Sequence, residues 1–303
     1  MTFEIATPST TPRNDFFLSL REAKRRSNPL EEKRLPRLRL AMTVGRGDGG
    51  FQIIKKEKIM YEYYLLFFGL ILVCAVFAGW ASSKVHSTFN AYREVGTSSH
   101  MTGYDTAVRL MRANDIRGIS IGRVRGFLTD HYHPTKKIVN LSESTYASDS
   151  VAAVAVAAHE IGHVVQKQRG YLPYKIRTVL VPITNIGSRL ALPLVLIGLI
   201  LDLFVGVTQN SDVGYFLAIL GVGLYGLSTL FALVTLPVEL DASRRAKRML
   251  VEEGIIREEE LPYAEKMLSA AARTYLASLL TSLVYFLRFA LWVLMLFGGR
   301  RRD

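Results

Sequence analysis

The chain has 303 residues, of which half are hydrophobic, and its formal net charge is +12. Such a composition suits either one or two soluble domains or a small membrane protein. The single cysteine, Cys74, excludes a disulfide within the chain and a metal site built from cysteines. The sequence contains no basic stripe interleaved with aromatic residues and no nucleic-acid motif, so we expect no nucleic-acid partner.

Residues 1–59 form an extension with the character of a linker. They include Thr-Pro and Gly-rich stretches and 13 Lys and Arg, without an apolar core pattern or a signal peptide. We expect this segment to be disordered or non-native. One hypothesis is that the native chain starts at Met60.

The distribution of the apolar residues indicates a mainly α-helical integral membrane protein. Four blocks are each about long enough to span a lipid bilayer as a helix. Asp202 and Arg288 are single ionisable residues within two of these blocks. We expect Asp202 to lie near an interface, and Arg288 to snorkel or to be paired. The four predicted spans are Tyr63–Ala81, Leu190–Val207, Val213–Leu236 and Leu276–Phe297.

These spans define the expected organisation of a multi-pass protein. A transmembrane anchor covers residues 60–81, and a transmembrane hairpin covers residues 190–236. The last span and a basic tail cover residues 276–303. The intervening segments 82–189 and 237–275 carry 14 and 7 Lys and Arg, whereas residues 208–212 carry none. By the positive-inside rule, the two basic segments face the cytoplasm.

The motif His159-Glu160-Ile161-Gly162-His163 predicts a zinc site in the first of these segments. Two histidines four residues apart lie on one face of a helix and can hold one metal ion, with Glu160 placed to activate a water molecule. The helix is expected to begin after Asp149 or Ser150 and to end near Gly170. Because its first turns are almost entirely apolar, it should be buried, and a buried His-Glu-His face is costly unless a metal satisfies it.

A catalytic zinc site needs a third protein ligand, for which Glu239 is the candidate. Pro237 predicts a break after the third span, followed by a helix with Glu239 in its first turn. The alternative is that Glu239 only stabilises the start of that helix. Asp241 is expected to support a zinc-bound histidine or to form a salt bridge with Arg244 or Arg245.

Residues 129–134 are predicted to form the loop of a β-hairpin between two strand-like runs, Gly118–Gly126 and Lys137–Leu141. Beside the zinc helix, such a hairpin could bind an extended peptide along its edge. His131 or Tyr132 could then stabilise the oxyanion of the reaction. A simple polar turn is the alternative.

Several segments resemble the YugP-type neutral zinc metallopeptidases of prokaryotic membranes. The resemblance covers roughly residues 60–297 and implies a zinc hydrolase of the inner or plasma membrane that acts on peptide bonds. The layout also resembles the CAAX-protease-like membrane gluzincins, in which an aspartate usually follows four residues after the ligand glutamate. Ser243 occupies that position here. The matching segments are Met101–Gly103, Leu128–Tyr132, Leu141–Glu143, Ala157–His163, Val181–Pro182, Asn185–Ser188 and Leu236–Ala246.

The sequence therefore predicts four transmembrane helices with a zincin-like α+β catalytic portion, made of the zinc helix and a small β-hairpin. We expect an endopeptidase in which His159, His163 and Glu239 hold Zn²⁺, and Glu160 is the general base for a metal-activated water. Its substrate is a peptide or protein, and the oligomeric state is left open. The alternatives are an intramembrane metalloprotease with Asp202 as third ligand, or a non-catalytic scaffold or chaperone stabilised by zinc.

Overall fold

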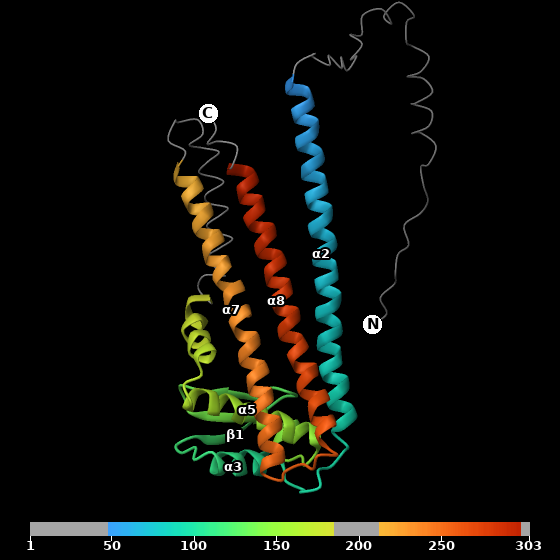
Figure 1. Ribbon diagram of the computed structural model, residues 1–303, viewed down its shortest axis with the longest axis vertical. Helices are drawn as coiled ribbons and strands as arrows, with labels where there is room; N and C mark the ends of the chain where they lie inside the picture. The colour runs from blue at the N-terminus through green and yellow to red at the C-terminus, as the bar shows by residue number, and fades with distance from the viewer. Residues whose placement is uncertain (1–47, 185–211, 298–303) are drawn as a thin grey trace, which may run out of the picture. The chain divides into compact units, whose positions relative to one another are not determined.

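The computed structural model describes residues 48–184 and 212–297. The chain divides into two compact units, residues 1–62 and 63–303, and every contact discussed below lies within the second unit. The described part is mostly helical and contains one small mixed sheet (Figure 1).

Three helices are long and apolar enough to cross a membrane. They are α2 (Asp48–Tyr92), α7 (Asp212–Glu252) and α8 (Leu261–Phe297). Three of the four predicted spans fall within these helices. The remaining one, Leu190–Val207 with Asp202, lies outside the described residues and stays a prediction.

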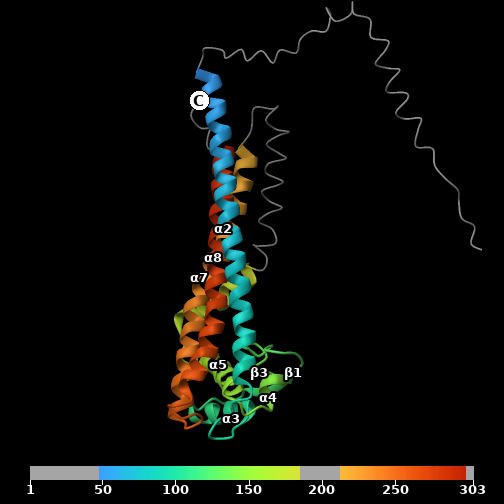
Figure 2. The ribbon, with the colours of Figure 1, turned by 90° about the vertical axis from the view of Figure 1, so that its right-hand side faces the viewer.

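Helices α7 and α8 lie side by side and run antiparallel (Figures 1 and 2). Ala218 near the start of α7 packs with Val293 near the end of α8. Further along, the hydroxyl oxygens of Thr229 and Ser282 lie 2.9 Å apart. A hydrogen bond between hydroxyls is a common way to satisfy polar side chains between apolar helices.

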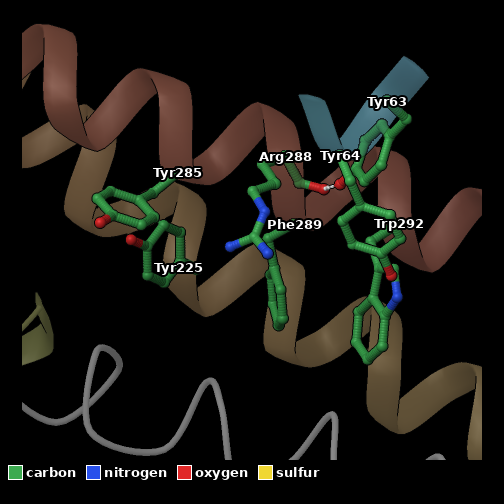
Figure 3. Close-up of a pocket in the computed structure, with 7 residues that line it drawn as sticks. All are labelled: Tyr63, Tyr64, Tyr225, Tyr285, Arg288, Phe289 and Trp292. Carbon is green, nitrogen blue, oxygen red and sulfur yellow. Dashed lines mark hydrogen bonds between the residues drawn. The ribbon is translucent and has the colours of Figure 1, made fainter. Parts of the chain in front are cut away.

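Arg288 lies in a pocket formed by aromatic side chains of α2, α7 and α8 (Figure 3). The cavity has a volume of about 390 Å³, and the hydroxyl of Tyr63 donates a hydrogen bond to the backbone carbonyl of Arg288. Tyrosine and tryptophan side chains pack against apolar helices through their rings. Their ring faces and polar groups can also interact favourably with a cation such as the Arg288 guanidinium. The lining residues are Tyr63, Tyr64, Tyr225, Tyr285, Arg288, Phe289 and Trp292.

The sheet contains β1 (Ser120–Val124), β2 (His131–His133) and β3 (Ile138–Ser142) in the order β1-β3-β2. β3 pairs parallel with β1 and antiparallel with β2. The prediction of a single hairpin around residues 129–134 is therefore wrong in its pairing. After Gly126 and Leu128, both at positive φ, the chain passes to the other side of β3 and adds His131–His133 as a strand. The hairpin of this sheet joins β2 to β3.

Helix α5 (Val151–Gln168) is the centre of the core, and most of its side chains are buried. The Ser150 hydroxyl accepts a hydrogen bond from the Ala153 N–H at its start. At its end, Gly170 has φ +66°, and the N–H of Tyr171 donates to the carbonyl of Gln166. This is the left-handed termination that glycine favours, so both predicted ends of the zinc helix are confirmed. The helix packs against α3 (Gly103–Ala113), α4 (Glu143–Tyr146), α7 and α8.

Pro237 lies inside α7, and the predicted break at this residue is wrong. Proline removes one backbone hydrogen bond from a helix, but packing on both sides can hold the helix together. Here α7 packs against α5 and α8, and Gln166 of α5 donates a hydrogen bond to the carbonyl of Val238, directly after the proline. The candidate span and the segment with Glu239 are consequently one continuous helix.

Candidate metal centre

The centre is formed where α5 approaches α7 closely (Figure 1). Gly162, between the two histidines of the motif, makes this approach possible. A Cβ atom at Gly162 would lie 2.7 Å from the carbonyl oxygen of Ala242 on α7. The glycine therefore allows the backbones of the two helices to pack in direct contact, and it places Glu239 opposite the histidines.

His159, His163 and Glu239 each direct one ligand atom to a common point, and these atoms lie within 4.8 Å of one another. Glu239 Oε2 is 3.1 Å from His159 Nε2 and 3.4 Å from His163 Nε2. Glu239 is almost completely buried, with 1% of the surface of the residue exposed. The structure thus brings together the three residues that the sequence analysis proposed as ligands.

The orientation of His163 is fixed by Gln166, one turn further along α5. Gln166 Nε2 lies 2.7 Å from the Val238 carbonyl oxygen and 2.9 Å from Asp241 Oδ2. Both partners only accept hydrogen bonds, so the other amide atom, Oε1, must face His163 Nδ1 at 3.0 Å. Nδ1 therefore carries the proton of the neutral ring, and Nε2 presents a lone pair towards Glu239. Asp241 does not contact the histidine: it bonds Gln166 and forms the salt bridge with Arg245 that was the other alternative, at 2.6 Å.

The other two candidate ligands also have outer partners. Ser243 Oγ lies 3.1 Å from His159 Nδ1, so this serine occupies the place of the aspartate expected in the wider group. Arg177 Nη1 forms an ion pair with Glu239 Oε1 at 2.9 Å, which leaves Oε2 to face the histidines. Outer hydrogen bonds of this type orient metal ligands and set the histidine tautomer.

This donor set fits a zinc ion. Two imidazole nitrogens and one carboxylate oxygen are ligands that Zn²⁺ prefers, and three protein ligands leave a position for a reactant. Lone pairs of His163 Nε2 and Glu239 Oε2 that face each other at 3.4 Å repel unless a cation or proton lies between them. The residues that would hold zinc are therefore His159, His163 and Glu239.

Glu160 lies beside the candidate ligands, but burial has a different effect on its carboxyl group. Burial raises the pKa of its carboxyl group to about 7, and the nearby Glu239 and Asp130 carboxylates also raise it, against the effect of His159. The backbone of Tyr132 nearby also lowers this pKa, by less than burial raises it. A carboxyl group with a pKa near neutrality is suited to accept and return a proton.

Two cavities meet at Glu160. The larger has a volume of about 510 Å³ and extends past His131, His163 and Arg177. The other has a volume of about 340 Å³ and extends towards α2 and α8. Four residues line both cavities, namely Asp130, His159, Glu160 and Tyr275. The candidate centre is therefore accessible from two sides.

His131 and Tyr132 lie on β2 and line the larger cavity, as the sequence analysis expected for residues close to the reaction. The ring of His131 is engaged on both nitrogens. Nδ1 lies 2.9 Å from the Thr129 carbonyl, and Nε2 lies 3.0 Å from Asn140 Nδ2. With its proton on Nδ1, this ring has no N–H left for an oxyanion.

Sequence reasoning missed Gln166, Tyr174, Arg177 and Tyr275. Helical residues 172–184 place Tyr174 and Arg177 on the wall of the larger cavity. Burial, with smaller contributions from Tyr132 and other neighbours, raises the pKa of Tyr174 to about 12, so its hydroxyl is a hydrogen-bond donor at neutral pH. Gln166 could have been found, because it lies three residues after His163 on the same helix. No local pattern marks the other three.

The fold and the site together define a class of protein. It is a helical chain with apolar helices of membrane-spanning length and a His-His-Glu geometry suited to zinc.

A family model described as "Putative neutral zinc metallopeptidase" matches residues 67–294, and the chain belongs to this family. The chain is also 40% identical over 239 residues to "Putative membrane protease YugP" of Bacillus subtilis (strain 168). That alignment covers 79% of this chain and the whole of the relative. The family resemblance seen in the sequence is thereby confirmed. No solved structure is significantly similar to the chain.

Proposed function

We propose that the protein is a membrane-bound zinc endopeptidase whose catalytic side faces the cytoplasm. The observation that carries the proposal is the convergence of His159, His163 and Glu239 beside a buried Glu160. The family description and the name of the Bacillus relative support peptide-bond hydrolysis. Two cavities on either side of Glu160 support an endopeptidase, because a bound chain can continue past the reacting bond in both directions.

The residues of the site would divide the chemistry between them. Zinc, when bound, supplies a Lewis acid that polarises the scissile carbonyl and makes a water molecule more acidic. Glu160 takes the proton from the attacking water and delivers it to the leaving amine. The hydroxyl of Tyr174 is the proposed donor to the oxyanion, since it stays protonated and lines the same cavity as Glu160.

The edge strand β2 is the proposed support for an extended substrate. It lies at the end of the sheet order and contacts α5. The backbone of Tyr132, in the middle of this strand, lies close enough to Glu160 to lower its pKa. The strand therefore runs beside the proposed general base, and a peptide along β2 would use its outward-facing backbone groups.

The first test measures zinc per chain in detergent-purified protein. Wild type should hold one zinc, Glu239→Ala should lose it, and Asp202→Ala should keep it. Loss only in Asp202→Ala would instead support the intramembrane metalloprotease. A non-catalytic zinc scaffold would have a closed set of four protein ligands, whereas the described residues contribute three.

The second test separates metal binding from catalysis. Glu160→Gln should keep the zinc of wild type and lose at least 100-fold of the hydrolysis of fluorescently labelled, denatured casein. Chelation should abolish the activity of wild type, and added zinc should restore it. A zinc-loaded Glu160→Gln variant that cleaves casein at the wild-type rate would refute the general-base role.

A further inference from the structure

The polar ends of three candidate spans meet at the proposed catalytic centre. The apolar run of α2 ends at Ala81, that of α7 ends at Leu236, and that of α8 begins at Leu276. The cavities at Glu160 are lined by residues one to three positions beyond these limits, namely Ser82, Glu239 and Tyr275. At 1.5 Å per helical residue, the centre lies within about 5 Å of the level where the spans end.

Helical residues 172–184 provide a second, independent observation. Leu172, Ile176, Val179 and Ile183 follow the spacing of one helix face and fall within about 60° of one another. All four are exposed, by 66%, 40%, 63% and 43%. On the opposite face, Tyr174, Arg177, Thr178 and Val181 line the larger cavity. The same helix is therefore a wall of the site and carries an apolar stripe that is exposed in the described part of the chain.

The occupant that the position and chemistry of this stripe favour is a lipid bilayer. The stripe lies on a helix that lines the cavity into which Glu239 and Tyr275 point from the ends of their spans. Lys175, near the start of this helix, lies about 60° to one side of the stripe, so its charge can stay at the polar level while the stripe faces the apolar region. Exposure of these four apolar side chains to water would be unfavourable in free energy, whereas contact with the apolar part of a bilayer would bury them.

We propose that the centre cleaves membrane-anchored proteins in the segment that directly follows their own span. This inference rests on the proposed peptidase function and adds the class of substrate. A substrate helix that lies beside α2, α7 or α8 is displaced by about one helix diameter, roughly 10 Å. An extended chain covers this distance in a few residues. The bond that is cleaved therefore lies within about ten residues of the end of the substrate span.

The experiment uses the full-length, zinc-loaded protein in lipid vesicles with a single-span reporter. The reporter carries a linker of identical six-residue repeats, so that distance from the membrane changes while the local sequence does not. Mass spectrometry of the products should show cleavage in the first two repeats at least tenfold more often than in the last two. Equal cleavage of all repeats would overturn the inference and leave the peptidase function intact. If wild type cleaved neither the reporter nor the free linker peptide in detergent, and so behaved like Glu160→Gln, the inference and the peptidase function would both be overturned.

A second arm tests the stripe itself. In Leu172→Ser/Val179→Ser, cleavage of the anchored reporter in vesicles should fall at least tenfold, while hydrolysis of the free linker peptide in detergent is retained. The matched control, Leu172→Met/Val179→Ile, keeps the stripe apolar and should behave as wild type in both assays. Wild-type cleavage of the anchored reporter by the serine variant would contradict contact between the stripe and the bilayer.

Discussion

Gly162 on α5 faces the carbonyl oxygen of Ala242 on α7 so closely that a methyl group at this glycine would lie 2.7 Å from it. The two residues mark the point at which the helix with the histidines touches the helix with the glutamate. The geometry of the ligand set therefore depends on the absence of a side chain at one position between the two histidines.

Gly162→Ala is expected to destabilise the protein, although alanine is a better helix former than glycine. The added Cβ meets backbone atoms, which cannot move without shifting a helix. We expect a loss of about 2 kcal/mol in the free energy of unfolding, in the range of overpacked cores, together with weaker zinc binding. Thermal unfolding in detergent and zinc content would measure both effects.

Gly223→Ala in α7 is the matched control, because no atom lies within 4 Å of its added Cβ. It should leave zinc content unchanged and should not lower the unfolding temperature. If Gly162→Ala behaved like this control, the close approach of α5 and α7 would not determine the site.

Gln166→Met should weaken zinc binding by about 10- to 100-fold, the usual effect of removing a group that orients a metal ligand. The amide fixes the proton of His163 on Nδ1, and methionine is similar in size but cannot accept this hydrogen bond. Competition with a fluorescent chelator would measure the affinity. Gln168→Met, at an exposed position two residues along α5, should bind zinc as wild type does. Equal affinity of the two variants would show that Gln166 only fills space.

The raised pKa of Glu160 predicts a pH dependence of stability in the zinc-free protein. Its value is about 7 in the folded chain and 4.5 in the reference state, so the folded protein binds this proton more tightly. The contribution of Glu160 to stability is therefore fully present below pH 4.5 and is lost as the pH rises towards 7. At 1.36 kcal/mol per pKa unit, the loss is at most about 3 kcal/mol.

Urea unfolding of the zinc-free protein in detergent at several pH values would measure this effect. Between pH 4.5 and 7.5, wild type should lose stability relative to Glu160→Gln, which has no ionisable group at this position. Added zinc should reduce the difference, because the charge of the ion favours the carboxylate. Parallel pH profiles for the two zinc-free proteins would contradict the assignment.

The parts of this structure that could be predicted from sequence are those set by neighbours along the chain. Both ends of α5 follow from Ser150 and Gly170, which act within one turn of the helix. The shared face of His159 and His163 follows from helix geometry alone. The prediction of Glu239 as third ligand rested on its place shortly after the third predicted span, next to Pro237.

The parts that could not be predicted depend on packing between distant segments. β1 and β3 are neighbours in the sheet although β2 lies between them in the sequence, and no turn residue specifies which strand becomes central. The outer partners Ser243 and Arg177 lie 84 and 62 residues from the groups they contact, His159 and Glu239. The predicted break at Pro237 rested on the local tendency of proline to end a helix. Packing of α7 against α5 and α8 overrides that tendency.

The uninterrupted course of α7 through Pro237 links the site to the thickness of the bilayer. The apolar part of this helix, Val213–Leu236, and the candidate ligand Glu239 belong to one continuous helix. No loop between them allows the two parts to change their orientation independently. A helix adjusts to a thinner bilayer by tilting. Such a tilt would change the distances from Glu239 on α7 to His159 and His163 on α5. We therefore expect lipid chain length to alter metal affinity without any change in the protein sequence.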